Sequence, residues 1–261
     1  MTDSQTLNQG ERHQYILNAL HERGSVAVAE LAGELKVSEV TIRKDLSMLE
    51  QQKKLYRAHG SAILISPYIS DRHVSEKEKQ SVPEKRAIGV EAARLIAPND
   101  SIVIASGTTM LYFAREIHPA EPLTVITSSV QVTSILSQES RVEVYQLGGF
   151  VRRSSVSVAG NYAEEMLRSF HCSKLFIGVD GIDPGFGLTT TNVMEASVNR
   201  AMIDAAQKVV VLADSSKFGR RGFSRICGLD AVDEIITDSG IAQHTLQQLA
   251  DRGVTVRVVE I

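Results

Sequence analysis

Two adjacent cations, Arg43 and Lys44, stand inside a segment whose apolar residues repeat at helical spacing. At about 100° per residue, the side chains of Ile42, Leu46 and Leu49 fall on one stripe and leave both cations outside it. Arginine suits guanine edges or phosphate groups, and lysine suits phosphate. Most charged helix faces simply meet water, but this face is also suited to contact a nucleic acid.

The residues before this helix complete a helix-turn-helix pattern. A first helix is predicted over residues 11–23 and a second over residues 29–35, and Lys36-Val37 then makes a tight link to Ser38, a good helix cap. A helix held by such a turn can insert its first residues into a major groove. The DNA contacts expected from this segment are Ser38, Glu39, Val40, Thr41, Arg43 and Lys44.

A basic hairpin is predicted directly after that helix. Residues 53–65 indicate two short strands around Gly60, and such a wing would lie along a phosphate backbone or enter a minor groove. Its expected contacts are Arg57 and His59. Residues 36–60 contain six cations and three carboxylates, a local charge of +3, whereas the whole chain carries -3. A basic stripe on an acidic protein indicates one face built for a polyanion.

Small and hydroxyl-bearing residues gather after several apolar runs in the rest of the chain. Glycines let backbone amides approach a ligand, hydroxyls donate hydrogen bonds, a helix N-terminus favours an anion, and a lysine supplies a point charge. Ionised carboxylates accept hydrogen bonds from sugar hydroxyls. Together they predict a sugar-phosphate pocket lined by Ser106, Gly107, Thr108, Thr109, Thr127, Ser128, Ser129, Gly148, Gly149, Asp180, Asp183 and Lys217.

Each of these loops also has an ordinary structural interpretation. Gly148-Gly149 fits a turn, Asp214-Ser215 fits a helix cap, and residues 180–187 fit a flexible connection. Five such loops at five strand ends are harder to explain in this way.

The elements that must position these loops form an alternating pattern, which predicts an α/β domain with a mostly parallel sheet. Short apolar runs cover residues 101–105, 123–127, 142–147, 175–179, 209–213, 234–237 and 254–259. Helical patterns cover residues 85–96, 109–117, 193–206 and 242–252. In such a sheet a ligand binds beyond the carboxyl ends of the strands, where the polar loops fall.

The composition excludes several classes of protein. No apolar run approaches the roughly 18 residues of a membrane span, and the first residues lack the sections of a secretory signal, so we expect a cytoplasmic protein. Cys172 and Cys227 lie far apart, without metal-ligand spacing, and we expect no metal site. No P-loop lysine motif and no Gly-x-Gly-x-x-Gly opens a helix, so we expect no nucleotide cofactor.

A set of short motifs spans both halves of the chain: Val37-Ser38, Thr41-Ile42-Arg43, Asp45-Leu46, residues 57–62, Ser106-Gly107-Thr108-Thr109, Leu147-Gly148-Gly149, residues 180–183 and 187–190, Glu195-Ala196 and residues 214–218. With these motifs the sequence resembles, over nearly its whole length, the DeoR family of bacterial transcriptional repressors. The resemblance implies a winged helix-turn-helix domain that binds an operator, and a sensor domain for a phosphorylated sugar. It also implies a sensor fold similar to ribose-5-phosphate isomerase, and it adds Glu195 to the expected effector-binding residues.

This resemblance completes the expected domain organisation. We expect the winged helix-turn-helix domain over residues 1–66, a polar linker over residues 67–83 and the sugar-phosphate sensor domain over residues 84–261. Residues 179–183, with Asn199-Arg200 and residues 214–221, look most like the amino-sugar branch, the N-acetylgalactosamine operon repressors.

Four positions depart from the pattern of the family. Lys44 stands where a second arginine is commonest, and Ser61 replaces the second glycine of the wing. Ala105 takes the place of a usual aspartate and Ser128 that of a usual asparagine. The last two changes remove a carboxylate and an amide from the expected pocket, which leaves open a different hydroxyl pattern in the ligand or a weaker site.

The leading hypothesis is a repressor of a carbohydrate-utilisation operon that a phosphorylated sugar or amino sugar releases from DNA. Two half-sites require two recognition helices, so at least a dimer is expected. The expected partners are therefore operator DNA, a small-molecule sugar phosphate and further copies of the chain, as a dimer or a tetramer.

Two rival hypotheses remain open at this point. One is a phosphosugar isomerase that carries a DNA-binding domain, with acid and base roles for Asp180, Asp183, Glu195 and Lys217. The isomerases that the chain resembles have a further lysine after the paired aspartates, and residues 187–192 contain none. The other is a sensor that no longer binds DNA, which the exposed cations of the N-terminal region disfavour.

Overall fold

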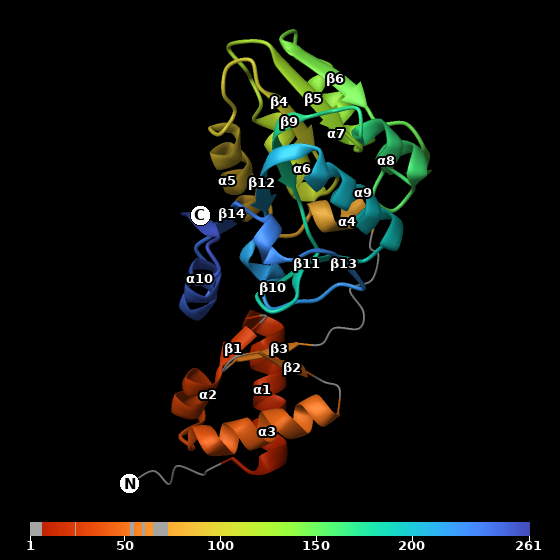
Figure 1. The fold of residues 1–261 in the computed structure, drawn as a ribbon. Coiled ribbons are helices and arrows are strands. Elements are labelled where there is room, and N and C mark those ends of the chain that lie inside the picture. The colour runs from red at the N-terminus through yellow and green to blue at the C-terminus, as the bar shows by residue number, and fades with distance from the viewer. Residues whose placement is uncertain (1–6, 24, 53–54, 59–60, 65–72) are drawn as a thin grey trace.

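The computed structural model describes residues 7–23, 25–52, 55–58, 61–64 and 73–261. Figure 1 shows a small N-terminal lobe, made of helices and a short sheet, and a larger lobe built around a central sheet. The predicted fold class, a helix-turn-helix lobe followed by an α/β lobe with a parallel sheet, is therefore confirmed.

In its described residues, the N-terminal lobe contains three helices and a three-stranded antiparallel sheet. The elements are α1 (Gln9–Arg23), β1 (Ser25–Ala27), α2 (Val28–Leu35), α3 (Glu39–Gln51), β2 (Leu55–Ala58) and β3 (Ser61–Leu64). Strands β2 and β3 form the predicted hairpin, with Ala58 opposite Ser61. Strand β1, which pairs with the other side of β3, was not predicted from the sequence.

The core of this lobe fixes which face of α3 turns outward. Ile42, Leu46 and Leu49 are buried against apolar side chains of the other helices, including Ile16 and Leu31. Burial of each such side chain contributes about 1.5–3 kcal/mol. The apolar stripe therefore holds one face of α3 inside the lobe, as its spacing predicts, and leaves the opposite face to solvent.

The larger lobe is organised by a seven-stranded sheet in which every neighbouring pair is parallel. Its strand order is β15-β14-β12-β9-β4-β5-β6. The strands are β4 (Ser101–Ile104), β5 (Leu123–Thr127), β6 (Val142–Gln146), β9 (Cys172–Ile177), β12 (Ala206–Leu212), β14 (Glu234–Asp238) and β15 (Thr255–Val259). Each of the seven predicted apolar runs lies on one of these strands.

Helices cover both faces of this sheet because successive strand residues point to opposite sides. Val103 faces the cluster that contains residues of α8 (Asn161–Leu167), α9 (Val193–Asp204) and α10 (Gln243–Ala250). Its neighbours Ile102 and Ile104 face the cluster with α5 (Val82–Ala93), α6 (Thr108–Arg115) and α7 (Val130–Leu136). Helices α7 and α8 were not predicted from the sequence.

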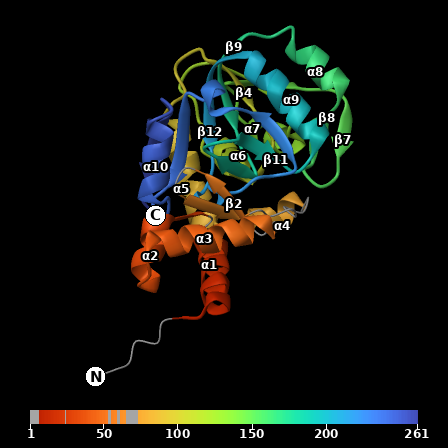
Figure 2. The same cartoon turned by 60° about the horizontal axis from the view of Figure 1, so that its bottom comes forward.

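Two small antiparallel elements extend beyond the sheet. One is a hairpin of β7 (Phe150–Arg152) and β8 (Ser157–Ala159), which lies beside α8 in Figure 2. The other is a sheet with the order β10-β11-β13, formed by β10 (Gly181–Asp183), β11 (Gly187–Thr190) and β13 (Ser224–Cys227). Neither was predicted, because short strands without alternating apolar residues give no periodic signal.

The expected linker, residues 67–83, holds a helix in its described part. Residues 67–72 lie outside the described residues, α4 (Val74–Glu78) follows, and α5 begins at Val82. Helix α4 packs against α6 of the larger lobe. The boundaries of the two domains stay a prediction. In the part of the chain that is described, no helix combines the length and apolar character that a membrane crossing requires.

Candidate functional site

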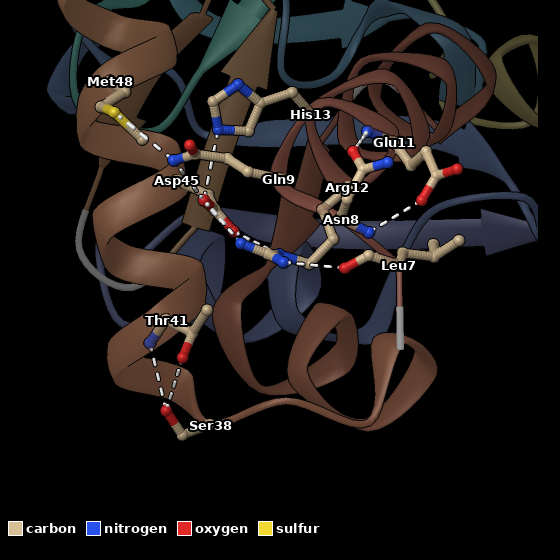
Figure 3. Close-up of polar contacts among 10 residues, drawn as sticks. All are labelled: Leu7, Asn8, Gln9, Glu11, Arg12, His13, Ser38, Thr41, Asp45 and Met48. Carbon is tan, nitrogen blue, oxygen red and sulfur yellow. Dashed lines mark hydrogen bonds and ion pairs between the residues drawn. The ribbon is translucent and has the colours of Figure 1, made fainter. Parts of the chain in front are cut away.

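The turn before α3 holds the start of this helix in a defined geometry. Lys36 takes the left-handed conformation (φ 52°) that ends α2. Two residues later, the Ser38 Oγ accepts a hydrogen bond from the Thr41 amide at 3.2 Å and lies 2.9 Å from the Thr41 Oγ1 (Figure 3). The predicted N-cap is confirmed, and the helix starts where the sequence indicates.

The outward face of α3 carries the cations. Val40 and Lys44 are exposed, and the Arg43 side chain is 63% exposed beside Glu39, with 2.9 Å between its NH2 and the Glu39 Oε2. An exposed pair of this kind contributes about 0.3–0.5 kcal/mol. Arg43 can therefore exchange Glu39 for a phosphate or a base edge at little cost.

The wing supplies the last two expected DNA contacts. Arg57 lies on β2, where its backbone pairs opposite Ala62. His59 lies outside the described residues. Both contacts therefore stay predictions.

A buried carboxylate fixes α3 to α1. Asp45 is 1% exposed, and its Oδ2 lies 2.8 Å from the Arg12 Nε, while its Oδ1 lies 3.2 Å from the His13 Nε2 (Figure 3). Burial alone would raise the pKa of Asp45, but the hydrogen bond and charge of Arg12 outweigh it and hold the pKa below its usual value. In the sequence, Asp45 lies on the same helical stripe as Ile42 and Leu49, which indicates a buried carboxylate, but no role was predicted for it.

A second polar site lies at the carboxyl ends of the central strands β4, β9 and β12. A cavity of about 60 Å³ opens there, between these strand ends, α4, the turn of the β7–β8 hairpin and the start of α9. It is lined by Val74, Lys77, Ser106, Gly107, Thr108, Thr109, Ser154, Ser155, Gly178, Val179, Asp180, Thr190, Glu195 and Lys217.

An ion pair crosses this cavity. The Lys77 Nζ lies 2.9 Å from the Asp180 Oδ1, and the other oxygen, Oδ2, accepts hydrogen bonds from the Thr190 hydroxyl and the Thr191 amide. Burial raises the pKa of Asp180, but the charges of Lys77 and Lys217 outweigh this and lower its pKa overall. Asp180 is therefore an ionised acceptor.

A second carboxylate is held by a buried arginine. Glu195 lies in the first turn of α9, and its Oε2 is paired with the NH1 of Arg152, whose hydrogen bonds also reach the hydroxyls of Ser154 and Ser155. Burial, together with the nearby Asp180, raises the pKa of Glu195, and Arg152 opposes the rise. The cavity thus holds two carboxylates with different proton affinities.

The opposite wall is suited to an anion. Thr108 and Thr109 occupy the first turn of α6, where backbone amides have no intrahelical acceptor. Gly107 precedes them with a φ of 127°, a conformation that L side chains rarely adopt. Lys217 adds a positive charge from the loop after β12. Backbone amides at a helix start combined with a lysine form a typical phosphate site.

Beneath α4 lies a buried lysine. Lys85 on α5 is 3% exposed, and its Nζ donates to the carbonyl oxygens of Lys77 at 2.6 Å and Gln80 at 2.5 Å. Burial lowers the pKa of Lys85 from 10.5 to about 8. Lys85 therefore holds the C-terminal end of α4 against the body of the lobe.

Seven of the thirteen predicted effector residues line the cavity, and six do not: Thr127, Ser128, Ser129, Gly148, Gly149 and Asp183. The β7–β8 hairpin lies across the end of β5, where the Ser128 carbonyl accepts from the Val158 amide. Ser129 caps α7 instead. The Asp183 side chain is 0% exposed and accepts from the amides of Gly185 and Phe186.

Several cavity residues were missed in the sequence. Lys77 lies in the expected linker, and Ser154 and Ser155 lie in a turn that joins two unpredicted strands. Arg152, which pairs with Glu195, was not among the expected residues either. In the described part of the chain, no group of His, Cys, Asp or Glu side chains is arranged to hold a metal ion.

Both lobes of the chain match known protein families and sequences. Residues 12–68 match the family model described as "DeoR-like helix-turn-helix domain", and residues 80–239 match "DeoR C terminal sensor domain". The chain is 38% identical over 251 residues to "Uncharacterized HTH-type transcriptional regulator YulB" of Bacillus subtilis (strain 168), covering 96% of this chain and 97% of that protein. It is 36% identical over 252 residues to "Putative aga operon transcriptional repressor" of Escherichia coli O157:H7, covering 95% and 93%.

Among solved structures, the chain is similar to ribose 5-phosphate isomerase A from Methanocaldococcus jannaschii. That match has a TM-score of 0.39 and 18% identity, and it covers 51% of this chain and 53% of the isomerase. A probable sor operon regulator from Shigella flexneri matches with a TM-score of 0.41 and 11% identity, covering 82% of this chain and 94% of that chain.

Proposed function

Because the chain belongs to the DeoR family of transcriptional regulators, we propose that it represses a carbohydrate-utilisation operon and leaves the operator when a phosphorylated sugar fills the cavity. The family is one of regulators, so the rival hypothesis of an isomerase is set aside. The observation that carries the proposal is the pairing, in one cavity, of an anion-binding helix start with two carboxylates.

We assign operator reading to α3 and the wing. The exposed residues Val40, Arg43 and Lys44 supply apolar contacts for a thymine methyl and cations for guanine or phosphate. Glu39, with the capped start formed by Ser38 and Thr41, orients this face, while Arg57 and His59 reach the backbone beside the groove. Two such helices are needed for two half-sites, so the active form is at least a dimer that works with DNA in the cytoplasm.

The effector is a phosphorylated sugar in this proposal, with its phosphate at the start of α6. The amides of Thr108 and Thr109 and the charge of Lys217 bind that group. Asp180 and Glu195 then accept hydrogen bonds from the sugar. An amino sugar is our first candidate, because its N–H group requires an acceptor and the relative named for the aga operon belongs to the same family.

Titration of an operator duplex tests the proposal. The duplex is obtained by selection from random sequences, and its affinity is measured with glucosamine 6-phosphate, N-acetylgalactosamine 6-phosphate and ribose 5-phosphate. We expect at least one of them to weaken binding by about 5- to 150-fold and to raise the melting temperature of the free protein. The unphosphorylated sugars are the matched controls.

The variant Lys217→Met should lower the affinity for the active sugar phosphate without changing operator binding in its absence. If no sugar phosphate changes either the melting temperature or the operator affinity, the proposed effector class is wrong.

A further inference from the structure

Helix α4 occupies a particular position between the two lobes of the chain. It is the first described element after β3, the last strand of the DNA-binding lobe, and residues 65–72, which connect them, lie outside the described residues. Two of its five residues, Val74 and Lys77, line the cavity. Any movement of α4 therefore acts on the chain that leads to the DNA-binding lobe.

The two ends of α4 are held by different parts of the molecule. At its C-terminal end, the Glu78 carboxylate pairs with Arg115 on α6 at 2.7 Å, and Lys85 holds the carbonyls of Lys77 and Gln80. At its N-terminal end, the Val74 amide donates to the Ser154 carbonyl, in the turn of the β7–β8 hairpin, at 2.6 Å. The C-terminal end is thus fixed to the body of the lobe by charged contacts, whereas the N-terminal end is held by this hydrogen bond to a wall of the cavity and by the buried side chain of Val74.

The walls of the cavity, which measures about 60 Å³, are held in different ways. Gly178 follows directly after β9 and Ser106 lies two residues after β4, and the neighbouring strands of the central sheet fix their position. Helix α4 lies outside the sheet and reaches the core through the buried side chain of Val74, so we take it as the wall that a ligand can shift.

The ion pair between Lys77 and Asp180 identifies the contact that a ligand must change. Asp180 also accepts hydrogen bonds from Thr190 and Thr191, so it stays with β11 and the loop after it. Lys77 has its ammonium on α4 and reaches across the cavity to this carboxylate. An anionic ligand competes with Asp180 for that ammonium, because charge-assisted hydrogen bonds to phosphate are among the strongest in proteins.

We propose that α4 is the element that conveys occupation of the cavity to the DNA-binding lobe: the ligand takes Lys77 from Asp180, and α4 turns about its anchored C-terminal end. This inference rests on the proposed function, since it needs a ligand that alters operator affinity. It satisfies the thermodynamic requirement for coupling, because the ligand binds differently to the two positions of α4. Lys85 is a positioning residue here, as it supplies the fixed end.

A reversible covalent lock tests the inference in the full-length protein. In the double variant Val74→Cys/Ser154→Cys, a disulfide formed under oxidation joins the N-terminal end of α4 to the hairpin turn. In the native protein the Val74 amide nitrogen and the Ser154 carbonyl oxygen are 2.6 Å apart. The probe is the sugar phosphate of the panel that weakens operator binding most in the wild type. The matched controls are the two single-cysteine variants under the same redox conditions.

With the lock closed, we expect the probe to change operator affinity by less than about 2-fold relative to the same locked protein without the probe. Reduction of the same sample should restore a response of about 5-fold or more. If the locked protein releases the operator as fully as the reduced one, α4 does not convey the signal, and the inference is overturned. Absence of a response in the wild type would instead refute the proposed function.

A second variant separates coupling from ligand binding. Lys77→Met is measured at ligand concentrations that saturate it, as judged by its melting temperature, and Lys79→Met is the control on the same stretch of chain. We expect saturated Lys77→Met to keep operator affinity within about 3-fold of its ligand-free value, while Lys79→Met responds like the wild type. A full response from Lys77→Met would contradict the exchange at Asp180.

Discussion

Helix α3 and the cavity both contain charged side chains, but the ion pairs of the two regions join different parts of the chain. On α3, Arg43 pairs with Glu39, four residues away on the same exposed helix face. In the cavity, Lys77 pairs with Asp180 and Arg152 with Glu195, and each pair joins segments that are far apart in the chain. The cation of α3 is therefore exposed to a partner from outside the chain, whereas the cations of the two cavity pairs already bind carboxylates of the chain itself.

This difference has an energetic consequence. An exposed ion pair contributes about 0–1 kcal/mol, so DNA can replace it at almost no cost. Removal of one partner from a buried pair costs about 3–5 kcal/mol, because a charge is left without compensation. We therefore expect that displacing a charge from a pair in the cavity costs more free energy than displacing Arg43 from Glu39.

The largest expected effect is the loss of both exposed cations. The double variant Arg43→Ala/Lys44→Ala should weaken operator binding by about 3–4 kcal/mol, because each base or phosphate contact contributes about 1–3 kcal/mol. The slope of log affinity against log salt should fall by about two. The melting temperature should stay unchanged, since both side chains are exposed. Arg168→Ala, at the exposed arginine that follows α8, is the control, and equal losses from both variants would contradict the assignment.

A single buried carboxylate should have the next largest effect. Asp45→Asn removes the charge that holds Arg12 and His13, and the free energy of unfolding of the N-terminal lobe should fall by about 2–3 kcal/mol. Because the pKa of Asp45 is lowered in the folded state, this contribution is present above the ordinary carboxyl pKa and is lost as pH falls through the folded-state value.

Urea unfolding of Asp45→Asn and wild type at pH 7 and at pH 3 measures this effect. The stability difference between the two proteins should be smaller at pH 3. A difference that does not depend on pH would show that the charge of Asp45 is not what stabilises the lobe.

The buried lysine predicts a pH dependence of the same sign as that of Asp45, but at higher pH. The pKa of Lys85 is about 8 in the folded protein and 10.5 ordinarily, so the unfolded chain binds more protons between these values. Stability should therefore rise with pH across this window, by about 2 kcal/mol from pH 7.5 to 9.5 relative to Lys85→Met. Parallel curves for the two proteins in urea unfolding at both pH values would contradict a buried ammonium at this site.

The smallest expected effect comes from the exposed ion pair on α3. Glu39→Gln removes the partner of Arg43 on the helix surface, and stability should change by no more than about 0.5 kcal/mol. Operator affinity should stay the same or rise by about 2-fold, because a carboxylate near phosphate is removed. A loss of more than about 10-fold in affinity would mean that Glu39 reads the operator directly.

The same difference explains what the sequence could and could not predict. Arg43 and Lys44 were placed on the outward face because the helical period alone decides it, and the seven strands were found because each apolar run ends in polar residues. Thr127 ends strand β5 and Ser129 follows it, yet β8 lies across that strand end and separates them from the cavity. Lys77 was read as part of a polar linker, because its partner Asp180 lies 103 positions further along the chain. Contacts between distant segments leave no periodic signal.

The most direct test of the account is the affinity of the active sugar phosphate, measured by calorimetry with the free protein and with the protein saturated by operator. Thermodynamic linkage requires that the operator weaken binding of the ligand by the same factor by which the ligand weakens binding of the operator. We predict equal factors of about 5 to 150 in the two directions. If the sugar phosphate binds the free and the operator-bound protein with the same affinity, the cavity does not control DNA binding.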